Sequence, residues 1–195
     1  MADKIAHISY GDAPLSTAHN PDTVGVNEEE GLAAHRGDRL VGRTVTINRP
    51  RQELYEFWRD LRNLPSFMEN VRSVTVSDNK RSHWVVEAPA GRLVEWDSIL
   101  TRDTSGSLLE WESVEGASVR NTGRIEFSDS TNGRGTLVTA TIVYDPPAGK
   151  LGSAIAKLFE KEPQIQVRRD LRRFKQLMEA GEIATSSPPN PAPKA

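Results

Sequence analysis

Two carboxylates and one histidine in the middle of the chain have the types and spacing that could support acid–base chemistry. Glu95 and Asp97 are one residue apart, so in a strand they share a face, and paired carboxylates with different pKa values can act as acid and base. The alternation of this segment turns them to the face opposite Trp96, which predicts that they lie in solvent and pair with arginines of neighbouring strands. A register shifted by one residue would turn them inward and favour catalysis. His83, the only side chain of the central region that titrates near neutrality, is also predicted to point outward.

A second set of polar candidates consists of side chains predicted to face the inside of a sheet. Ser98 and Ser113 carry hydroxyls, and Tyr144 carries a phenol, that can orient a carbonyl group by hydrogen bonding. None of the three is a good base at neutral pH without a partner. Asn121 and Arg124 are further polar candidates near the end of the sheet. We therefore assign no catalytic residue from the sequence.

Metal and cofactor chemistry have no support in the sequence. The chain contains no cysteine, which excludes a thiolate nucleophile and any Cys-based metal site. Its four histidines are far apart, and three of them lie in the first 40 residues. The nucleophile elbow GxSxG, the phosphate loop GxxxxGK[ST] and the dinucleotide fingerprint GxGxxG are all missing. We expect neither a metal nor a cofactor.

The elements that must position these residues are mainly strands. Between residues 70 and 147 six segments alternate apolar and polar residues, and turn signals such as Asn132-Gly133 separate them. Their short links predict an antiparallel meander. The predicted strands are Val71–Ser77, Ser82–Ala88, Leu93–Arg102, Leu108–Val114, Thr122–Ser128 and Thr136–Asp145.

Helical spacing is found on both sides of these strands. After a first strand at Val41–Ile47, Pro50 suits the first position of a helix, and a second, smaller helix is possible near Phe67. The first helix has an apolar stripe made of Leu54, Phe57, Trp58 and Leu61. A longer helix is predicted from Pro163 to a C-cap at Gly181. Its apolar face consists of Val167, Leu171, Phe174 and Met178.

Alternation also predicts which side chains line the concave face of the sheet. They are Trp84, Val86, Trp96, Ser98, Trp111, Ser113, Phe127, Ile142 and Tyr144. Phe174 and Met178 of the long helix should face them. Such rings with a few hydroxyls are typical of a small-molecule pocket, but large aromatic residues are equally ordinary in a packed core. The residues alone favour the core.

Composition and charge limit the domain organisation and the partners. With 36% hydrophobic and 27% charged residues the chain is of globular type. The acidic segment 1–40 and the Pro/Ser-rich segment 184–195 are predicted to be mostly disordered, which leaves one domain at 41–183. A net charge of −2 provides no overall basic field, so we expect no DNA partner. No apolar run reaches the roughly 20 residues of a membrane span, and the first residues lack the apolar core of a signal peptide, so we expect a cytoplasmic protein without integral membrane contact.

One helix surface is basic. It could contact RNA or an acidic membrane, although interspersed acids favour a solvated helix face. The cations are Arg168, Arg169, Arg172, Arg173 and Lys175.

The chain from 41 to 183 resembles a known family. The stretches that carry the resemblance are RPRQELYEFWRDLRNLPSFMENV, RLVEWDSIL, WES-VEGA-SVRNTGRIEF, GRGTLVTATIVYDPPAGKLG and DLRRFKQLMEAGE. They are similar to the polyketide cyclase/dehydrase branch of the START-like (SRPBCC) superfamily, which is related to coenzyme-Q-binding START proteins. The resemblance implies an α+β helix-grip fold, in which a seven-stranded curved antiparallel sheet surrounds a long C-terminal helix, with two small helices after the first strand. It also implies an internal hydrophobic cavity, and so favours the cavity over the core.

The resemblance leaves three functions open, because the family has no universal catalytic residue that could be transferred. The first is binding of a hydrophobic or amphipathic small molecule, such as a quinone, a lipid or a polyketide-like compound. The second is a polyketide cyclase, aromatase or dehydratase that uses the same cavity. The third is a macromolecular interaction protein with a vestigial cavity. A wholly apolar cavity favours binding, whereas buried acid and base groups favour catalysis.

Overall fold

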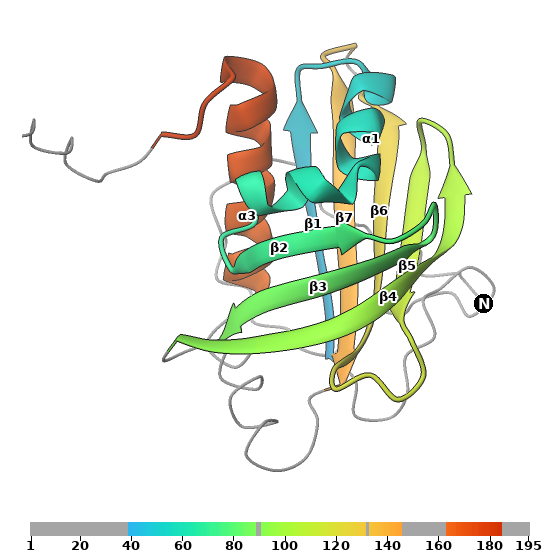
Figure 1. Ribbon diagram of the computed structural model, residues 1–195. Coiled ribbons are helices and arrows are strands. Elements are labelled where there is room, and N and C mark those ends of the chain that lie inside the picture. Colours follow the sequence, from blue (N-terminus) through green and yellow to red (C-terminus); the bar gives the residue numbers. More distant parts are fainter. Residues whose placement is uncertain (1–38, 89–90, 132, 146–162, 185–195) are drawn as a thin grey trace, which may run out of the picture.

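Seven antiparallel strands form one curved sheet in the described part of the chain (Figure 1). The computed structural model describes residues 39–88, 91–131, 133–145 and 163–184. The predicted acidic leader (1–40) and Pro/Ser tail (184–195) therefore fall almost entirely outside the described residues. The sheet, its antiparallel order and the C-terminal helix confirm the α+β helix-grip fold.

The strands agree with the sequence periodicity to within about two residues at each end, because period-two alternation is a local property of the chain. The strands are β1 (Arg39–Ile47), β2 (Val71–Val76), β3 (Arg81–Ala88), β4 (Arg92–Thr104), β5 (Leu108–Ser113), β6 (Arg120–Asp129) and β7 (Thr136–Asp145).

The strand order is β1-β7-β6-β5-β4-β3-β2. Strands β2 to β7 form the predicted meander, and β1 pairs with β7 at the far edge. The connection between β1 and β2 must therefore pass from one edge of the sheet to the other. It contains helix α1 (Arg51–Arg59) and the 3-10 helix η1 (Leu61–Ser66), which are the two small helices expected after the first strand. Figure 1 shows both helices against the sheet.

The helix boundaries follow the local signals with one correction. Pro50 was predicted at the first helical position, but its ψ of 140° is extended, and it lies just before α1. The long helix α3 (Pro163–Ala180) begins and ends where the sequence predicts. Gly181 follows it with a φ of 78°, a left-handed conformation that glycine adopts without steric cost.

The hydrophobic core lies between the concave face of the sheet and the helices. Phe174 of α3 is completely buried, with ring centroids 4.8 Å from Phe67, 5.0 Å from Trp58 and 5.8 Å from Phe57. Phe127 of β6 packs edge-on against Trp58. Aromatic side chains from α1, the end of η1, β6 and α3 therefore meet at one point and fix the helices against the sheet.

A bulge in β4 changes the direction of its last side chains. The pairing with β5 passes from Leu100↔Trp111 to Arg102↔Glu110, which leaves one extra residue in β4. As a consequence Asp103 lies opposite Leu109, a residue of the buried face. The Asp103 carboxylate accepts hydrogen bonds from the Tyr55 hydroxyl and from Arg59 Nε, both on α1, and so attaches α1 to β4.

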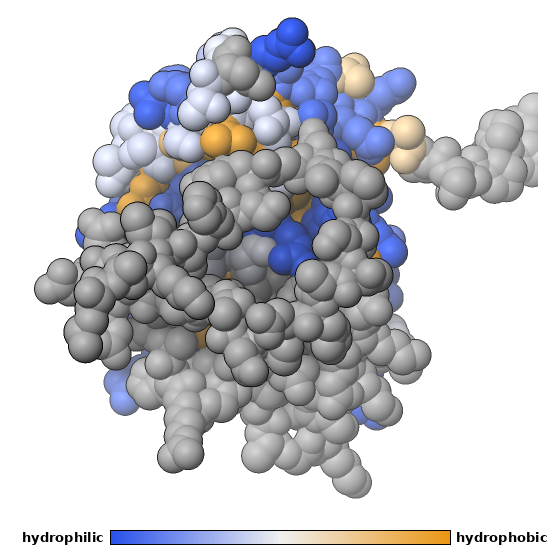
Figure 2. All heavy atoms as spheres, turned by 180° about the vertical axis from the view of Figure 1, so that it is seen from behind, coloured by the Kyte–Doolittle hydropathy of each residue, from blue (hydrophilic) through white to orange (hydrophobic). Residues whose placement is uncertain are grey.

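The apolar side chains of the described residues are directed mainly inward. Val76, Leu93 and Ile165 are the large hydrophobic residues exposed in that part of the chain. Seen from behind, most of the coloured surface is hydrophilic, with small apolar areas between (Figure 2).

Candidate ligand cavity

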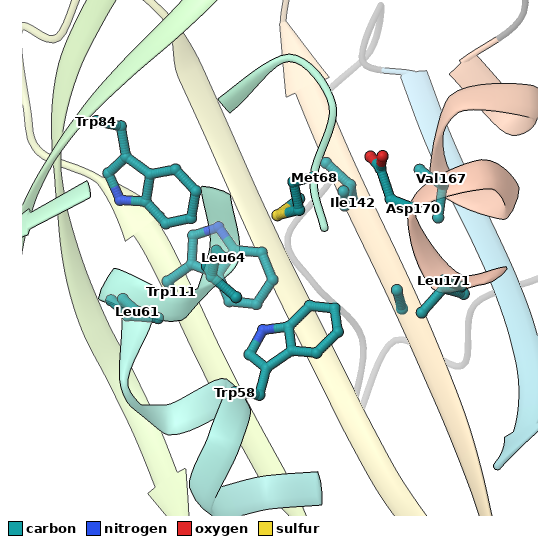
Figure 3. Close-up of a pocket in the computed structure, with 11 residues that line it drawn as sticks. Trp58, Leu61, Leu64, Met68, Trp84, Trp111, Ile142, Val167, Asp170 and Leu171 are labelled. Atoms are coloured by element: carbon teal, nitrogen blue, oxygen red, sulfur yellow. The ribbon is translucent and has the colours of Figure 1, made fainter. Parts of the chain in front are cut away.

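A small cavity lies between the sheet and the helices (Figure 3). Its volume is about 30 Å³. The sheet, α1, η1 and α3 all contribute to its wall. The lining residues are Trp58, Leu61, Leu64, Met68, Trp84, Trp111, Ala140, Ile142, Val167, Asp170 and Leu171.

Three tryptophans form much of this wall, and two of them come from neighbouring parts of the sheet. Trp84 of β3 and Trp111 of β5 point inward as alternation predicts, and Trp58 reaches the cavity from α1. Trp111 lies flat over Gly123 of β6, where any Cβ would overlap the indole ring. Gly123 therefore allows the large ring of Trp111 to pack directly on the backbone of the neighbouring strand.

The predicted site residues are divided between the cavity and the core. Trp84, Trp111 and Ile142 line the cavity. The side chain of Tyr144 lies outside the described part of the structure. Three others belong to the packed core instead: Phe127, Phe174 and Met178.

The remaining predicted residues lie on the concave face beside the cavity. Trp96 of β4 is stacked on Trp84, with ring centroids 6.2 Å apart and planes inclined by 6°. Ser98 is directly opposite Ser113 in the register of β4 and β5. Val86 is buried opposite Val94. These residues extend the aromatic wall on its sheet side.

Asp170 is the cavity residue of most chemical interest, and sequence reasoning did not select it. It is 7% exposed, and its Oδ1 accepts hydrogen bonds from the Glu69 backbone N–H at 3.1 Å and from Gln166 Nε2 at 3.0 Å. Burial raises the pKa of Asp170 to about 6, and these two hydrogen bonds oppose the rise. The signal was present in the sequence, because Asp170 follows Val167 by three residues and precedes Phe174 by four, which places a charge within the apolar stripe of the helix.

The helical residues of the wall were predicted as core and not as cavity lining. Leu61 and Leu64 lie in η1, Met68 follows it, and Val167 and Leu171 lie on α3. Periodicity identified several of them as buried, but it gave no information on which would border empty space.

The outward acids are placed as predicted, but their partner differs. Glu95 and Asp97 have side chains 54% and 59% exposed on the outer face. The predicted arginine partners are wrong, because both acids contact His83 of β3, at 3.6 Å and 2.8 Å. His83 is directly opposite Asp97 in the β3–β4 register, so it is closer than any arginine of a neighbouring strand. This group is separated from the cavity by the thickness of the sheet.

The basic surface of α3 is largely used within the domain. Arg169 Nη1 contacts Glu69 at 2.8 Å, Arg173 Nε donates to the Phe67 carbonyl at 2.8 Å, and Lys175 Nζ donates to the Thr46 carbonyl at 2.7 Å. These cations join α3 to the end of η1 and to β1.

The described residues contain neither a metal-binding group nor a membrane-spanning helix. No three or more His, Asp or Glu side chains in this part of the structure are grouped so that they could hold a metal ion. None of the helices described is both long and apolar enough to cross a membrane.

The family can be decided by comparison with known proteins. Residues 47–172 match the family model described as polyketide cyclase/dehydrase and lipid transport. The chain belongs to this family. A solved structure from Deinococcus radiodurans is 40% identical, with a TM-score of 0.60, and covers 73% of this chain and 99% of its own. No match was found among curated proteins.

Two more distant structures place this polyketide cyclase/dehydrase family member in the START fold. The Zhui aromatase/cyclase of Streptomyces sp. R1128 is 16% identical, has a TM-score of 0.57, and covers 75% of this chain and 99% of its own. A START superfamily protein of Mycobacterium smegmatis is 13% identical, has a TM-score of 0.55, and covers 71% of this chain and 98% of its own. At these identities the likeness concerns the fold alone.

Proposed function

We propose that this protein binds a hydrophobic or amphipathic small molecule, such as a quinone, a lipid or a polyketide-like aromatic compound, in the cavity between its sheet and its helices. The observation that carries the proposal is the cavity wall, in which ten of the eleven lining residues are apolar or aromatic and three are tryptophans. Flat rings on several sides favour a flat, apolar ligand. The description of the family, which includes lipid transport, supports this function.

At about 30 Å³ the cavity is too small for a ligand of two or three rings, so binding requires the wall to move. The movable part of the helical side is η1 with the residues that follow it, because η1 is a short 3-10 helix. Met68 has a flexible side chain that can take up new positions around a ligand. The sheet side is held by continuous backbone pairing and provides the fixed surface.

The test is a titration with the fluorescent apolar probe N-phenyl-1-naphthylamine. We expect saturation near one probe per chain. Ala140→Leu should abolish binding because Ala140 lines the cavity and the larger side chain occupies its space. Leu93→Ala is the matched control, because Leu93 is 55% exposed and outside the cavity. Binding that persists unchanged in Ala140→Leu would contradict the proposal and favour a protein that acts through its surface.

A second candidate function is a cyclase or dehydratase, and the buried carboxyl of Asp170 favours it. An acid with a pKa of about 6 can take up and release a proton near neutral pH, as such reactions require. Incubation with a poly-β-ketone substrate and analysis of the products by mass spectrometry separates the two functions. Turnover by the wild type that is lost in Asp170→Asn, with probe binding retained, would favour the enzyme.

A further inference from the structure

Buried polar atoms without a partner gather on the concave face beside the cavity. Ser98 is 1% exposed, and its hydroxyl has no hydrogen-bond partner among the described residues. The same is true of Trp96 Nε1, Asn121 Nδ2 and Thr122 Oγ1, of which the first two belong to residues on the inner face of the sheet. A buried polar atom without a protein partner is unusual in a folded protein and calls for an explanation.

The register of the sheet places Trp96, Ser98 and Asn121 on nearby strands and on one face. Trp96 and Ser98 are two residues apart in β4 and share its inner face. Ser98 is directly opposite Ser113 of β5, and residues so paired have Cβ atoms about 4.5–5.5 Å apart. Ser113 Oγ accepts a hydrogen bond from the Asn121 backbone N–H at 3.0 Å, which brings β6 to the same point.

The group adjoins the cavity through its aromatic wall. Trp96 is stacked on Trp84, whose ring lines the cavity. Trp111, two residues before Ser113 in β5, also lines it, and Figure 3 shows the rings of Trp84 and Trp111 as neighbours on the sheet side. Trp96, Ser98 and Asn121 do not line the cavity, so a ligand lying against these indoles reaches the unpartnered atoms only when the indole side chains shift.

A neighbouring Trp–Ser pair on the same face does form its hydrogen bond. Ser82, opposite Ser98 in the β3–β4 register, accepts a hydrogen bond from Trp84 Nε1 at 2.9 Å. The indole N–H of Trp96 has no corresponding acceptor in the described structure. An indole N–H and an amide NH₂ group are donors, and a serine hydroxyl can either donate or accept, so one acceptor oxygen from outside the domain could pair with any of the three.

We propose that Trp96, Ser98 and Asn121 form a polar subsite that binds a neutral carbonyl oxygen at one edge of an otherwise apolar ring ligand. This inference rests on the proposed function, and it specifies the ligand. All three donors are neutral, and burying a charged acceptor against neutral groups would be costly, so a ketone or quinone oxygen fits better than a carboxylate. A carbonyl oxygen has two lone pairs and can accept from two of the donors.

The test compares 1-tetralone with tetralin, two ring compounds of similar shape that differ by one carbonyl oxygen. Both are measured by displacement of N-phenyl-1-naphthylamine from the full chain. We expect 1-tetralone to bind more tightly, and we expect Ser98→Ala to reduce this preference roughly 3- to 10-fold, the range of one hydrogen bond. Ser128→Ala, an exposed serine of β6, is the control and should leave the preference unchanged.

Thermal unfolding without ligand provides a second measurement. Because the Ser98 hydroxyl has no partner, Ser98→Ala should leave the melting temperature unchanged or raise it. A lower melting temperature together with an unchanged preference would overturn the subsite and make Ser98 structural. Tetralin that binds as tightly as 1-tetralone in the wild type would overturn the subsite while leaving the proposed function intact. Failure of both compounds and of the probe to bind would overturn the proposed function itself and the subsite with it.

Discussion

At the scale of single residues, Asp170 is the one carboxyl group that is buried among the described residues. Its carboxyl joins α3 to the Glu69 backbone after η1 and at the same time borders the cavity. Burial opposes ionisation more strongly than the two hydrogen bonds favour it, so the folded pKa is about 6, against an ordinary value of 3.8. Two neighbouring charges also act on this carboxyl: Glu69 raises the pKa of Asp170 further, and Arg173 lowers it.

The first prediction follows from that shift. The folded state binds this proton more strongly than the unfolded state, so the resulting stability is fully present below pH 3.8 and is lost as the pH rises through 6. Asp170→Asn keeps an oxygen acceptor and cannot ionise. The free energy of unfolding of the variant should therefore rise relative to wild type by about 3 kcal/mol between acidic and neutral pH.

The measurement is urea unfolding of both proteins at a series of pH values. Asp129→Asn serves as control, because its carboxylate is 76% exposed on β6. A difference between Asp170→Asn and wild type that stays constant from pH 3.5 to pH 7 would contradict the raised pKa.

At the scale of elements, the helices are attached to the sheet at defined points. α1 is held by the Asp103 carboxylate that the β4 bulge turns inward. α3 is held by its central aromatic residue and by hydrogen bonds from Arg173 and Lys175 to backbone carbonyls. Between these attachments lies the cavity, so the helices enclose it without filling it.

The second prediction concerns the packing of α3. Phe174 is completely buried among the rings of Phe57, Trp58 and Phe67 and does not line the cavity. Phe174→Ala should therefore cost about 3–5 kcal/mol in the free energy of unfolding, the range of a large residue lost from a packed core. Chemical denaturation measures this cost, with the exposed Gln176→Ala on the same helix as control. A cost below about 1 kcal/mol would show that Phe174 borders open space.

The third prediction concerns Trp111 and the fixed wall of the cavity. Trp111→Ala should weaken binding of N-phenyl-1-naphthylamine, because the ring forms part of the lining. It should cost less in stability than Phe174→Ala, because Trp111 is only partly buried and already faces empty space on one side. Parallel unfolding and binding measurements on the two variants give the comparison. If Trp111→Ala lowers the stability but the folded variant still binds the probe as tightly as wild type, the ligand binds elsewhere.

At the scale of the whole molecule, the fold is carried by the central part of the chain. The family model matches residues 47–172, which lie inside the predicted domain at 41–183. The sheet with its helices accounts for the core and the cavity. The acidic leader and the Pro/Ser tail are outside this match.

The fourth prediction is that a shortened chain of residues 41–183 keeps the melting temperature of the full chain within a few degrees, because the composition of the removed segments offers little apolar surface to bury. Differential scanning calorimetry of the two chains tests it. A loss of ten degrees or more would show that the leader packs on the domain and contributes to its stability.

Much of the fold could be predicted from the sequence because it depends on local patterns. The alternation around Trp84, Trp96 and Trp111 determines the inner face of three strands, since a strand turns its side chains to opposite sides whatever lies around it. The apolar spacing of Val167 and Phe174 determines the buried face of α3 in the same way.

The cavity was decided only by the tertiary structure. It is the space that remains when side chains of α1, η1, the sheet and α3 have packed, so its position depends on the volumes of residues far apart in the sequence. That is why Phe127 and Met178 proved to be core, whereas Leu64 and Val167 line the cavity. The pKa of Asp170 has the same origin, because desolvation of a carboxyl is a property of everything packed around it and not of its neighbours in the chain.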